Sequence, residues 1–413
     1  MGTILKKTNS GLFFSQLTDL ASVNQALHFL KDDNQRTAKE QTVLTEIDAP
    51  PFHEQARAEW MADQFKMLGL TEVTIDAEGS VSGEWPGEQS TPKTVLSAHL
   101  DTVFDPGTPV KADIRDGIIH APGISDDGRG LACLLTVIRA LRTAGIKPLH
   151  SLLFVATVGE EGLGDLRGVK ALFKQRHDIG AFLSIEPGPA EYLTCTAVGS
   201  RRYRVSFKGP GGHSFASFGL PSAIHAMGRA IAAISDITVP RDPRTTFTVG
   251  KVGGGTSVNS IAEDAEMLLD LRSVSGQALT ALEDQAFTAI HKAVADENRR
   301  WNAEDAISVQ LKPIGNRPAG TQSTDATIID LGCAAVAAFG RQAELKAAST
   351  DSNVPISLGI PALTLSGGGV SGNEHTLEEF FDPTDAHIGP QIILLIALAI
   401  SGISGESASQ LFN

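Results

Sequence analysis

Two adjacent glutamates, Glu160 and Glu161, follow an apolar run at 152–158 in the segment SLLFVATVGEEGLG. A short apolar run of this kind predicts a buried strand. Two ionised carboxylates at the end of a buried strand repel each other and lose hydration. Other parts of the chain must therefore supply something that compensates their charge.

A histidine and an aspartate follow the apolar strand predicted in LSAHLDTVF. His99 and Asp101 are two residues apart, so in a strand their side chains point the same way. Asp101 can then accept a hydrogen bond from one ring nitrogen of His99 while the other nitrogen binds a metal. Taken alone, the motif more often marks a structural histidine.

Acidic and histidine side chains also follow other predicted strands or precede a helix. Asp126 and Asp127 lie in the glycine-rich turn of HAPGISDDGRGLACLL, before a predicted helix. One aspartate there is explained as an N-cap, but two exceed what a cap requires. Glu186 ends the apolar segment FLSIE, and His375 follows the strand PALTLS and a glycine-rich loop.

These groups can converge, because open parallel sheets bind ligands at the carboxyl ends of their strands. Two histidines and several carboxylates without cysteine suit zinc, or alternatively cobalt or manganese. Five ligands are too many for one tetrahedral zinc, whereas two metal ions about 3.5–4 Å apart that share a carboxylate would use them all. One of the two adjacent glutamates can then bind metal while the other acts as general base on water.

Apolar strands and amphipathic helices alternate from about residue 20 to residue 190. Helices are expected at 54–70 and 130–145, and strands at 93–101, 151–158 and 181–186. The pattern resumes after Gly320 and ends in an apolar helix around 392–400. Because the strands are apolar and separated by helices, they predict an α/β fold with a mostly parallel sheet covered by helices on both faces.

The pattern changes near Gly199. RRYRVSFKG alternates apolar and basic residues, which is typical of a strand with one exposed face. A helix at 221–235, strands at 245–252 and 265–273, a helix at 276–299 and a strand at 306–312 follow. The order β-α-β-β-α-β predicts a ferredoxin-like α+β domain. We expect this domain at 199–314, inserted between parts of a catalytic domain at 1–198 and 315–413, with hinges near 198–200 and 313–320.

Charge and cysteine content exclude several classes of partner. Lys and Arg number 34 and Asp and Glu 48, so the formal charge is −14. No basic field is available to attract nucleic acid or an anionic membrane. Cys133, Cys195 and Cys333 are scattered, which predicts neither a disulfide framework nor a cysteine-bound zinc. Without a signal peptide or a membrane-length apolar run, the expected location is the cytoplasm.

Together, the motifs resemble the dinuclear zinc hydrolases of peptidase family M20, which includes peptidase T, bacterial glutamate carboxypeptidase and acetylornithine deacetylase. The resemblance covers nearly the whole chain and is carried by SAHLDTV, SDDGRG, GEEGLGDLRG, SIEPG and NEHTLEEF. One departure concerns SDDGRG, because many relatives carry lysine in a DDKxG motif. The subfamily is therefore left open.

The resemblance implies a role for each motif residue. Asp126 would bridge two zinc ions and be joined to Asp127 by a peptide bond that the family tends to make cis. Glu160 would be the general base, and Asp101 would orient a ligand histidine. The other metal ligands would be His99, Glu161, Glu186 and His375.

The resemblance also implies that the inserted domain is a lid and forms a homodimer. His213, in GPGGHSF, would reach a neighbouring active site across the dimer and polarise the scissile carbonyl. Asn259 in GGGTSVNSI and Arg272 in LLDLRS match residues that touch the substrate or shape its site. The dimer seam is expected at an edge strand, RRYRVSFKG or its neighbour, because pairing would satisfy exposed backbone groups.

The implied reaction is amide hydrolysis by a water activated by two divalent metal ions, with Glu160 as general base. Di- and tripeptides are the expected substrates, because residues 349–369 most resemble the peptidase T-like and general peptidase branches. An N-acyl amino acid deacylase is the alternative, since the chemistry is identical. An inactive metal-binding regulatory protein is disfavoured by the presence of Glu160 and His213. A nucleotide-binding oxidoreductase is excluded, because no G-x-G-x-x-G follows the first strand.

Overall fold

The computed structural model describes residue 5 and residues 9–412, and the chain forms two compact units. Unit 1 comprises Met1–Thr196 and Gln322–Asn413, and unit 2 comprises Ala197–Thr321. The second boundary falls later than the expected 314/315. Pro313 and Gly315 suggest a strand end, but β14 (Ser308–Arg317) continues past them through a register shift.

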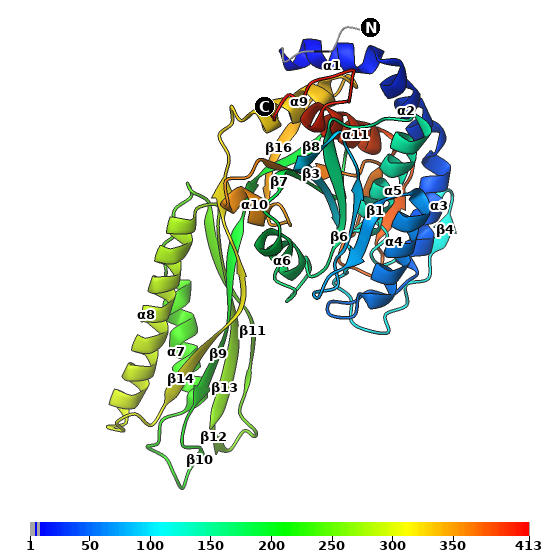
Figure 1. Cartoon of the computed structure of the whole chain (residues 1–413). Coiled ribbons are helices and arrows are strands. Elements are labelled where there is room, and N and C mark those ends of the chain that lie inside the picture. Colours follow the sequence, from blue (N-terminus) through cyan, green and yellow to red (C-terminus); the bar gives the residue numbers. More distant parts are fainter. Residues whose placement is uncertain (1–4, 6–8, 413) are drawn as a thin grey trace. The chain divides into compact units, whose positions relative to one another are not determined.

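Unit 1 is built on a mixed sheet (Figure 1). Its centre is formed by parallel strands in the order β6 (His150–Thr157), β3 (Gln89–His99), β7 (Ile179–Glu186) and β17 (Ala362–Ser366). Antiparallel pairing brings β2 (Val81–Trp85) against β6, β1 (Thr71–Ile75) against β2, and β8 (Tyr192–Ala197) against β17. The short strand β16 (Glu344–Ala348) also pairs with β8. The predicted α/β class is confirmed.

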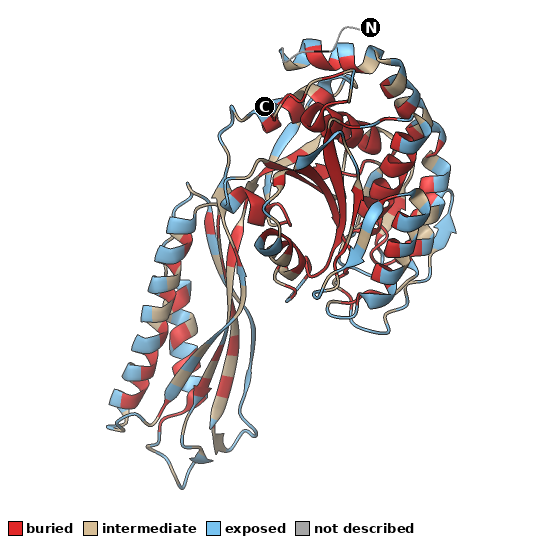
Figure 2. Ribbon diagram, viewed as in Figure 1, coloured by how far each residue is buried: buried red, intermediate tan, exposed pale blue. Residues whose placement is uncertain are grey.

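Helices lie on both sides of this sheet. In Figure 1, α4 (Gln55–Leu68) and α5 (Gly128–Thr143) lie on one side, and α6 (Arg167–Gln175) and α10 (Asn353–Ser357) lie on the other. Every residue from Gly128 to Leu141 in α5 is buried, and the central strands are buried along most of their length (Figure 2). The remaining helices of the unit are α1 (Ser10–Asp19), α2 (Ala21–Asp32), α3 (Asn34–Thr45), α9 (Thr327–Ala337) and α11 (Ile388–Ser401).

A second, small sheet in unit 1 was not expected. It has the order β18 (Val370–Gly372), β19 (Phe380–Asp382), β5 (Ile118–His120) and β4 (Asp113–Arg115). The strands have only three residues each, too few for an apolar alternation to be recognised. This sheet joins two distant parts of the chain, and it brings the loop that carries His375 to the turn that carries Asp126.

Unit 2 has an antiparallel sheet in the order β11 (Thr245–Gly254), β13 (Asp264–Ser273), β9 (Gly199–Lys208) and β14. Two helices, α7 (Ala223–Ser235) and α8 (Gly276–Arg300), pack on it around the buried Val205 and Phe207. The expected element order is present, with an added short pair, β10 (Gly212–His213) and β12 (Ser260–Ile261). The expectation that RRYRVSFKG is an edge strand is wrong, because β9 lies between β13 and β14. The edges are β11 and the neighbouring strand β14.

The cysteines Cys133 and Cys195 are buried, Cys333 is partly buried, and all of them are free thiols. Among the described residues, no helix has both the length and the hydropathy needed to cross a bilayer.

Candidate metal centre

The candidate site lies at the carboxyl ends of three adjacent parallel strands. His99 is the last residue of β3, Glu186 is the last residue of β7, and the turn with Glu160 and Glu161 follows β6. Asp126 lies in the turn before α5, and His375 lies in the loop between β18 and β19. His375 has a φ of 65°, a left-handed conformation that is uncommon outside glycine and that often marks functional positions.

Asp126 lies between the two histidines. One of its carboxylate oxygens is 3.0 Å from Nε2 of His99, and the other is 3.0 Å from Nε2 of His375. Nε2 of His99 is also 3.7 Å from Oε2 of Glu186, and Nε2 of His375 is 3.1 Å from Oε1 of Glu161. Asp126 is therefore shared by two groups of potential ligands, in each of which the ligand atoms lie within 4.8 Å of one another.

The chemistry of this cluster fits bound cations. Burial raises the pKa of Glu186 to about 7, and its Oε1 is buried without a hydrogen-bond partner among the described residues. Hydrogen bonds to Asp126 and Glu161 raise the pKa of His375 to about 10, so the acidic groups attract positive charge strongly. The donors are imidazole nitrogens and carboxylate oxygens, which suit zinc, cobalt or manganese. The residues present therefore fit two divalent metal ions.

Asp101 acts differently from the sequence-based expectation. The ring nitrogen Nδ1 of His99 is 2.9 Å from the main-chain oxygen of Asp101 but 3.7 Å from its carboxylate. The carboxylate is occupied elsewhere, because it accepts hydrogen bonds from the N–H groups of Gly159, Glu160 and Glu161 at 2.9, 3.2 and 2.8 Å. Asp101 thus holds His99 through its carbonyl and the turn from Gly159 to Glu161 through its side chain.

Asp127 connects the turn before α5 to the end of β3. Its carboxylate accepts one hydrogen bond from the N–H of Gly130, as an N-cap does, and another from the N–H of His99, both at 3.0 Å. The peptide bond between Asp126 and Asp127 is cis, as the resemblance implied.

Gly128 stands where many relatives have lysine, and the structure leaves no room for a side chain there. A Cβ atom at this position would lie 2.5 Å from Oγ1 of Thr45 and 2.8 Å from the carbonyl oxygen of Gly123. Glycine in place of lysine at this position therefore allows Thr45 to pack closely against the start of α5.

One buried acid at the site was missed in the sequence. Glu379 is fully buried, and its carboxylate accepts hydrogen bonds from the N–H groups of Gly123, Ser125 and Asp126 at 2.8, 2.8 and 2.9 Å. Burial raises its pKa to about 7. The acidic pair in NEHTLEEF was the available signal, but the sequence does not tell which of Glu378 and Glu379 is buried.

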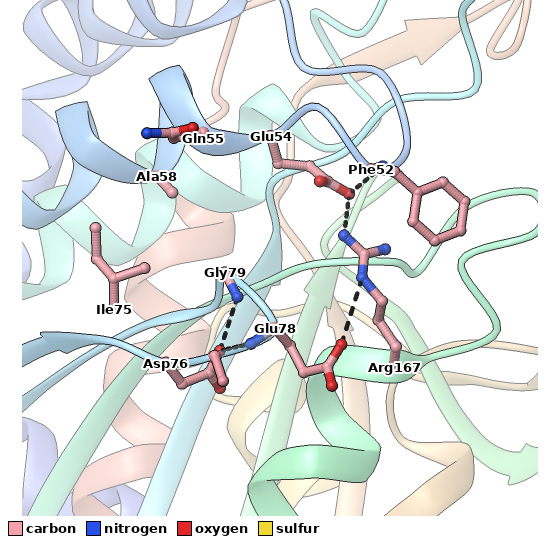
Figure 3. A pocket seen from close by; sticks show the side chains of 10 residues that line it. Phe52, Glu54, Gln55, Ala58, Ile75, Asp76, Glu78, Gly79 and Arg167 are labelled. Carbon is pink, nitrogen blue, oxygen red and sulfur yellow. Dashed lines mark hydrogen bonds and ion pairs between the residues drawn. The ribbon is translucent and has the colours of Figure 1, made fainter.

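A cavity of about 340 Å³ is lined by residues of α4, the turn after β1 and Arg167 (Figure 3). Arg167 lines it, donates a hydrogen bond to Glu54 at 2.7 Å and lies over the ring of Phe52 at 4.6 Å. A Cβ atom on Gly159 would lie only 2.4 Å from Nη1 of Arg167. Arg167 therefore packs closely against the turn that carries Glu160.

His213, Asn259 and Arg272 all belong to unit 2. His213 is exposed on β10, and its Nδ1 accepts hydrogen bonds from the N–H groups of Phe215 and Ala216, both at 3.3 Å. In the neutral ring, Nε2 therefore carries the hydrogen and is a donor. The carbonyl oxygen of Asn259 accepts a hydrogen bond from Ser214 at 2.9 Å, which places Asn259 beside His213.

Arg272 is not part of this group. β13 begins at Asp264, five residues after Asn259, and Arg272 lies near its other end, about 26 Å away along an extended strand. Its Nε donates a hydrogen bond to Asp270 at 2.6 Å. Within unit 2 the structure thus brings His213 and Asn259 together, and leaves Arg272 apart from them.

The sequence profile of peptidase family M20/M25/M40 matches residues 95–399, about three quarters of the chain. The chain belongs to this peptidase family. It is therefore a hydrolytic enzyme, and the resemblance inferred from the motifs is confirmed.

Similar proteins in this family include peptidases and deacylases. The uncharacterized protein YqjE of Bacillus subtilis is 27% identical over 81% of this chain and 91% of its own. Acetylornithine deacetylase of Proteus mirabilis is 24% identical over 70% of this chain and 74% of its own. A tripeptidase structure from Staphylococcus aureus has a TM-score of 0.75 and 21% identity, and it covers 88% of this chain and 97% of its own. YxeP of Bacillus subtilis, described as a dinuclear metal binding peptidase, has a TM-score of 0.67 and 17% identity, with coverages of 90% and 99%.

Proposed function

We propose that this M20 chain hydrolyses an amide bond in di- or tripeptides at a centre of two divalent metal ions. The observation that carries the proposal is the position of Asp126, whose two carboxylate oxygens each face the Nε2 atom of a different histidine at 3.0 Å. A carboxylate shared in this way is the natural bridge between two metal sites. The proposed ligands are His99, Asp126, Glu161, Glu186 and His375.

The metal ions, when bound, would supply Lewis acidity that lowers the pKa of water and polarises the substrate carbonyl. Zinc is the proposed metal, with cobalt and manganese as alternatives, since the donor set suits all of them.

Glu160 is the proposed general base. Its carboxylate oxygen lies within 4.8 Å of ligand atoms of His99 and Glu161, and hydrogen bonds from its turn to Asp101 hold its backbone. It accepts a proton from the attacking water and returns that proton to the leaving amine. Because the carboxylate is buried and held on a fixed turn, it needs little reorganisation during the reaction.

Unit 2 is proposed to act as a lid and to form a homodimer. Its His213 presents Nε2–H as a donor, which suits an oxyanion that develops on the scissile carbonyl. Asn259, which lies beside His213, is proposed to contact the substrate, as is Arg272 at the other end of β13. The proposed location is the cytoplasm, in keeping with the free thiols.

Two similarities support different substrates. The similarity of fold to the Staphylococcus aureus tripeptidase fits a small peptide. The sequence similarity to acetylornithine deacetylase makes an N-acyl amino acid the second candidate. Both substrates require the same cleavage of an amide bond.

The test uses metal-stripped full-length enzyme, to which zinc, cobalt or manganese is returned, and a panel of di- and tripeptides and N-acyl amino acids. We expect metal-dependent cleavage of peptides and a fall in kcat of about 10²- to 10⁴-fold in Glu160→Gln. Metal binding by this variant should match the wild type, because Glu160 is not a proposed ligand. Cleavage of N-acyl amino acids alone would favour the deacylase, and the absence of any metal-dependent turnover would contradict both candidates.

A further inference from the structure

A buried arginine that contacts the segment after β3 has no role in the proposed reaction. Arg57, on α4, is fully buried, and the hydrogen bonds described for its guanidinium all go to main-chain carbonyl oxygens. Nη1 donates to Leu100 at 2.8 Å, Nε and Nη2 donate to Ile47 at 2.9 and 2.7 Å, and Nη2 also donates to Thr45 at 3.2 Å. A buried cation is costly, so this placement needs compensation from its surroundings.

The contact with Leu100 reaches the metal centre directly, because Leu100 lies between His99 and Asp101. The N–H of Leu100 donates to the carbonyl of Thr157 at the end of β6, at 2.7 Å. Arg57 holds the carbonyl of the same residue. Leu100 is thus fixed through both its N–H and its C=O groups, and the adjacent His99 and Asp101 are fixed with it.

The positive charge of Arg57 is balanced by negatively charged carboxylates. Asp48, Asp101 and Asp127 are the acidic groups that act on it electrostatically. Burial lowers the pKa of Arg57 to about 10, which still leaves the guanidinium charged at neutral pH. Asp101 and Asp127 are both fully buried. Asp101 accepts a hydrogen bond from the main-chain N–H of Glu161, and Asp127 accepts one from that of His99; both of these residues are proposed ligands.

We propose that Arg57 is a positioning residue of the metal centre, which fixes the segment from His99 to Asp101 and offsets the charges of Asp101 and Asp127. The proposal rests on the proposed function, because His99 is a ligand only if the centre binds metal. It predicts that Arg57 determines the metal affinity of the folded protein as well as its stability.

The test measures Zn²⁺ and Co²⁺ binding to metal-stripped full-length protein by calorimetric titration, with folding checked by circular dichroism. The variants are Arg57→Met and Arg57→Lys. The matched control is Arg139→Met, because Arg139 is also a buried arginine of unit 1 but pairs with Asp33 at 2.6 Å. Arg139 lies about 18 Å from Asp127 along α5.

We expect Arg57→Met to weaken metal affinity about 10- to 100-fold, as the loss of residues that orient ligands does. Arg139→Met should stay within about twofold of the wild type, even if its thermal stability falls. Equal affinity in Arg57→Met and the wild type, or an equal loss in both arginine variants, would overturn the proposal.

Arg57→Lys decides the question if Arg57→Met does not fold, with Arg139→Lys as its control. Lysine keeps the charge but cannot bind three carbonyl groups in the same geometry. An affinity below that of the wild type supports the proposal, and an unchanged affinity overturns it. Failure of the wild type itself to bind Zn²⁺ or Co²⁺ would instead contradict the proposed function.

Discussion

Individual carboxylates at this site bind main-chain N–H groups in addition to carrying negative charge. The Asp101 carboxylate lies against the N–H groups of Gly159, Glu160 and Glu161, so a further negative charge is buried beside the two glutamates. Hydrogen bonds from main-chain N–H groups stabilise that carboxylate, but Glu160 and Glu161 still face like charges. The proposed metal ions would supply the compensating positive charge, and Arg57, which binds the carbonyl of the adjacent Leu100, would add to it.

A substitution at Glu379 tests whether a buried carboxylate stabilises the backbone through its hydrogen bonds to main-chain N–H groups. In Glu379→Gln the side-chain amide would place an NH₂ group against a main-chain N–H of the segment Gly123–Asp126. One buried donor would lose its acceptor, so we expect the free energy of unfolding to fall by about 1–3 kcal/mol. Urea denaturation of the metal-stripped protein measures this fall. Glu378→Gln is the matched control, because Glu378 is exposed, and an equal stability of both variants would contradict the role of Glu379.

His213 provides a test of the tautomer that its hydrogen bonds imply. Nδ1 accepts hydrogen bonds from main-chain N–H groups, which leaves Nε2–H as the donor of the neutral ring. Its proposed hydrogen bond to an oxyanion would be strongest in the transition state. In His213→Ala we expect kcat to fall about 10²- to 10³-fold, with a smaller change in KM. Steady-state kinetics on the peptide cleaved best would measure both constants.

The matched control is His225→Ala, another histidine of unit 2, whose side chain is 66% exposed. Its activity should equal that of the wild type. A His213→Ala enzyme that loses only substrate affinity would show that the ring binds the ground state and transition state equally.

At the scale of elements, the turn between β6 and α6 determines where Glu160 lies. Gly159 has a φ of 75°, and a Cβ atom there would lie 2.4 Å from Nη1 of Arg167 and 2.9 Å from the carbonyl oxygen of Gly164. We expect Gly159→Ala to shift the turn and to lower kcat at least tenfold, since small displacements of a catalytic group are costly. Kinetics and thermal unfolding measured together would test this.

Gly145→Ala separates the effect of crowding from that of backbone conformation. Gly145 also has a positive φ, 63°, but no atom lies within 4 Å of the position of its Cβ atom. This variant should lose about 1–2 kcal/mol of stability from the left-handed conformation alone and keep full activity. An equal loss of activity in both glycine variants would contradict the positioning role of the turn.

The central elements could be predicted because their patterns are local. The strand that carries His99 is mostly apolar from Val95 to Ala98, and the helix after Asp127 begins at a capping residue, so both appear in the sequence itself. The sheet of β18, β19, β5 and β4 could not be predicted, because its strands are very short and the pairing of β19 with β5 joins residues about 260 positions apart. The role of Glu379 and the role proposed for Arg57 could not be predicted either. Each depends on hydrogen bonds to main-chain groups that are distant in the sequence.

The orientation of Asp101 shows a second limit of sequence-based prediction. The spacing of His99 and Asp101 predicts a hydrogen bond between the imidazole and the carboxylate, but the ring faces the main-chain oxygen of Asp101 instead. Which oxygen of Asp101 faces the ring depends on the competing N–H groups of a turn that begins 58 residues later. The residues of the site were therefore predictable from motifs, whereas their hydrogen bonds required the fold.

At the scale of the whole molecule, unit 2 has two edge strands that can pair with a second copy. β11 is mostly exposed, and it carries Val252 with 55% of its surface accessible. An exposed edge with an apolar side chain favours association. We expect the wild type to sediment as a dimer and Val252→Lys to shift the equilibrium toward the monomer. Leu345→Lys, at an exposed leucine of unit 1, is the control and should remain dimeric.

Mixing two inactive variants tests whether His213 serves a neighbouring subunit. Glu160→Gln keeps His213, and His213→Ala keeps Glu160, so a mixed dimer has one complete site if His213 acts across the dimer. Random exchange of subunits places half of the molecules in mixed dimers, each with one complete site of two, so about a quarter of wild-type activity should return. Subunit exchange is verified with differently tagged chains. If exchange occurs without recovery of activity, His213 does not act on the partner's site, and the dimer serves another purpose.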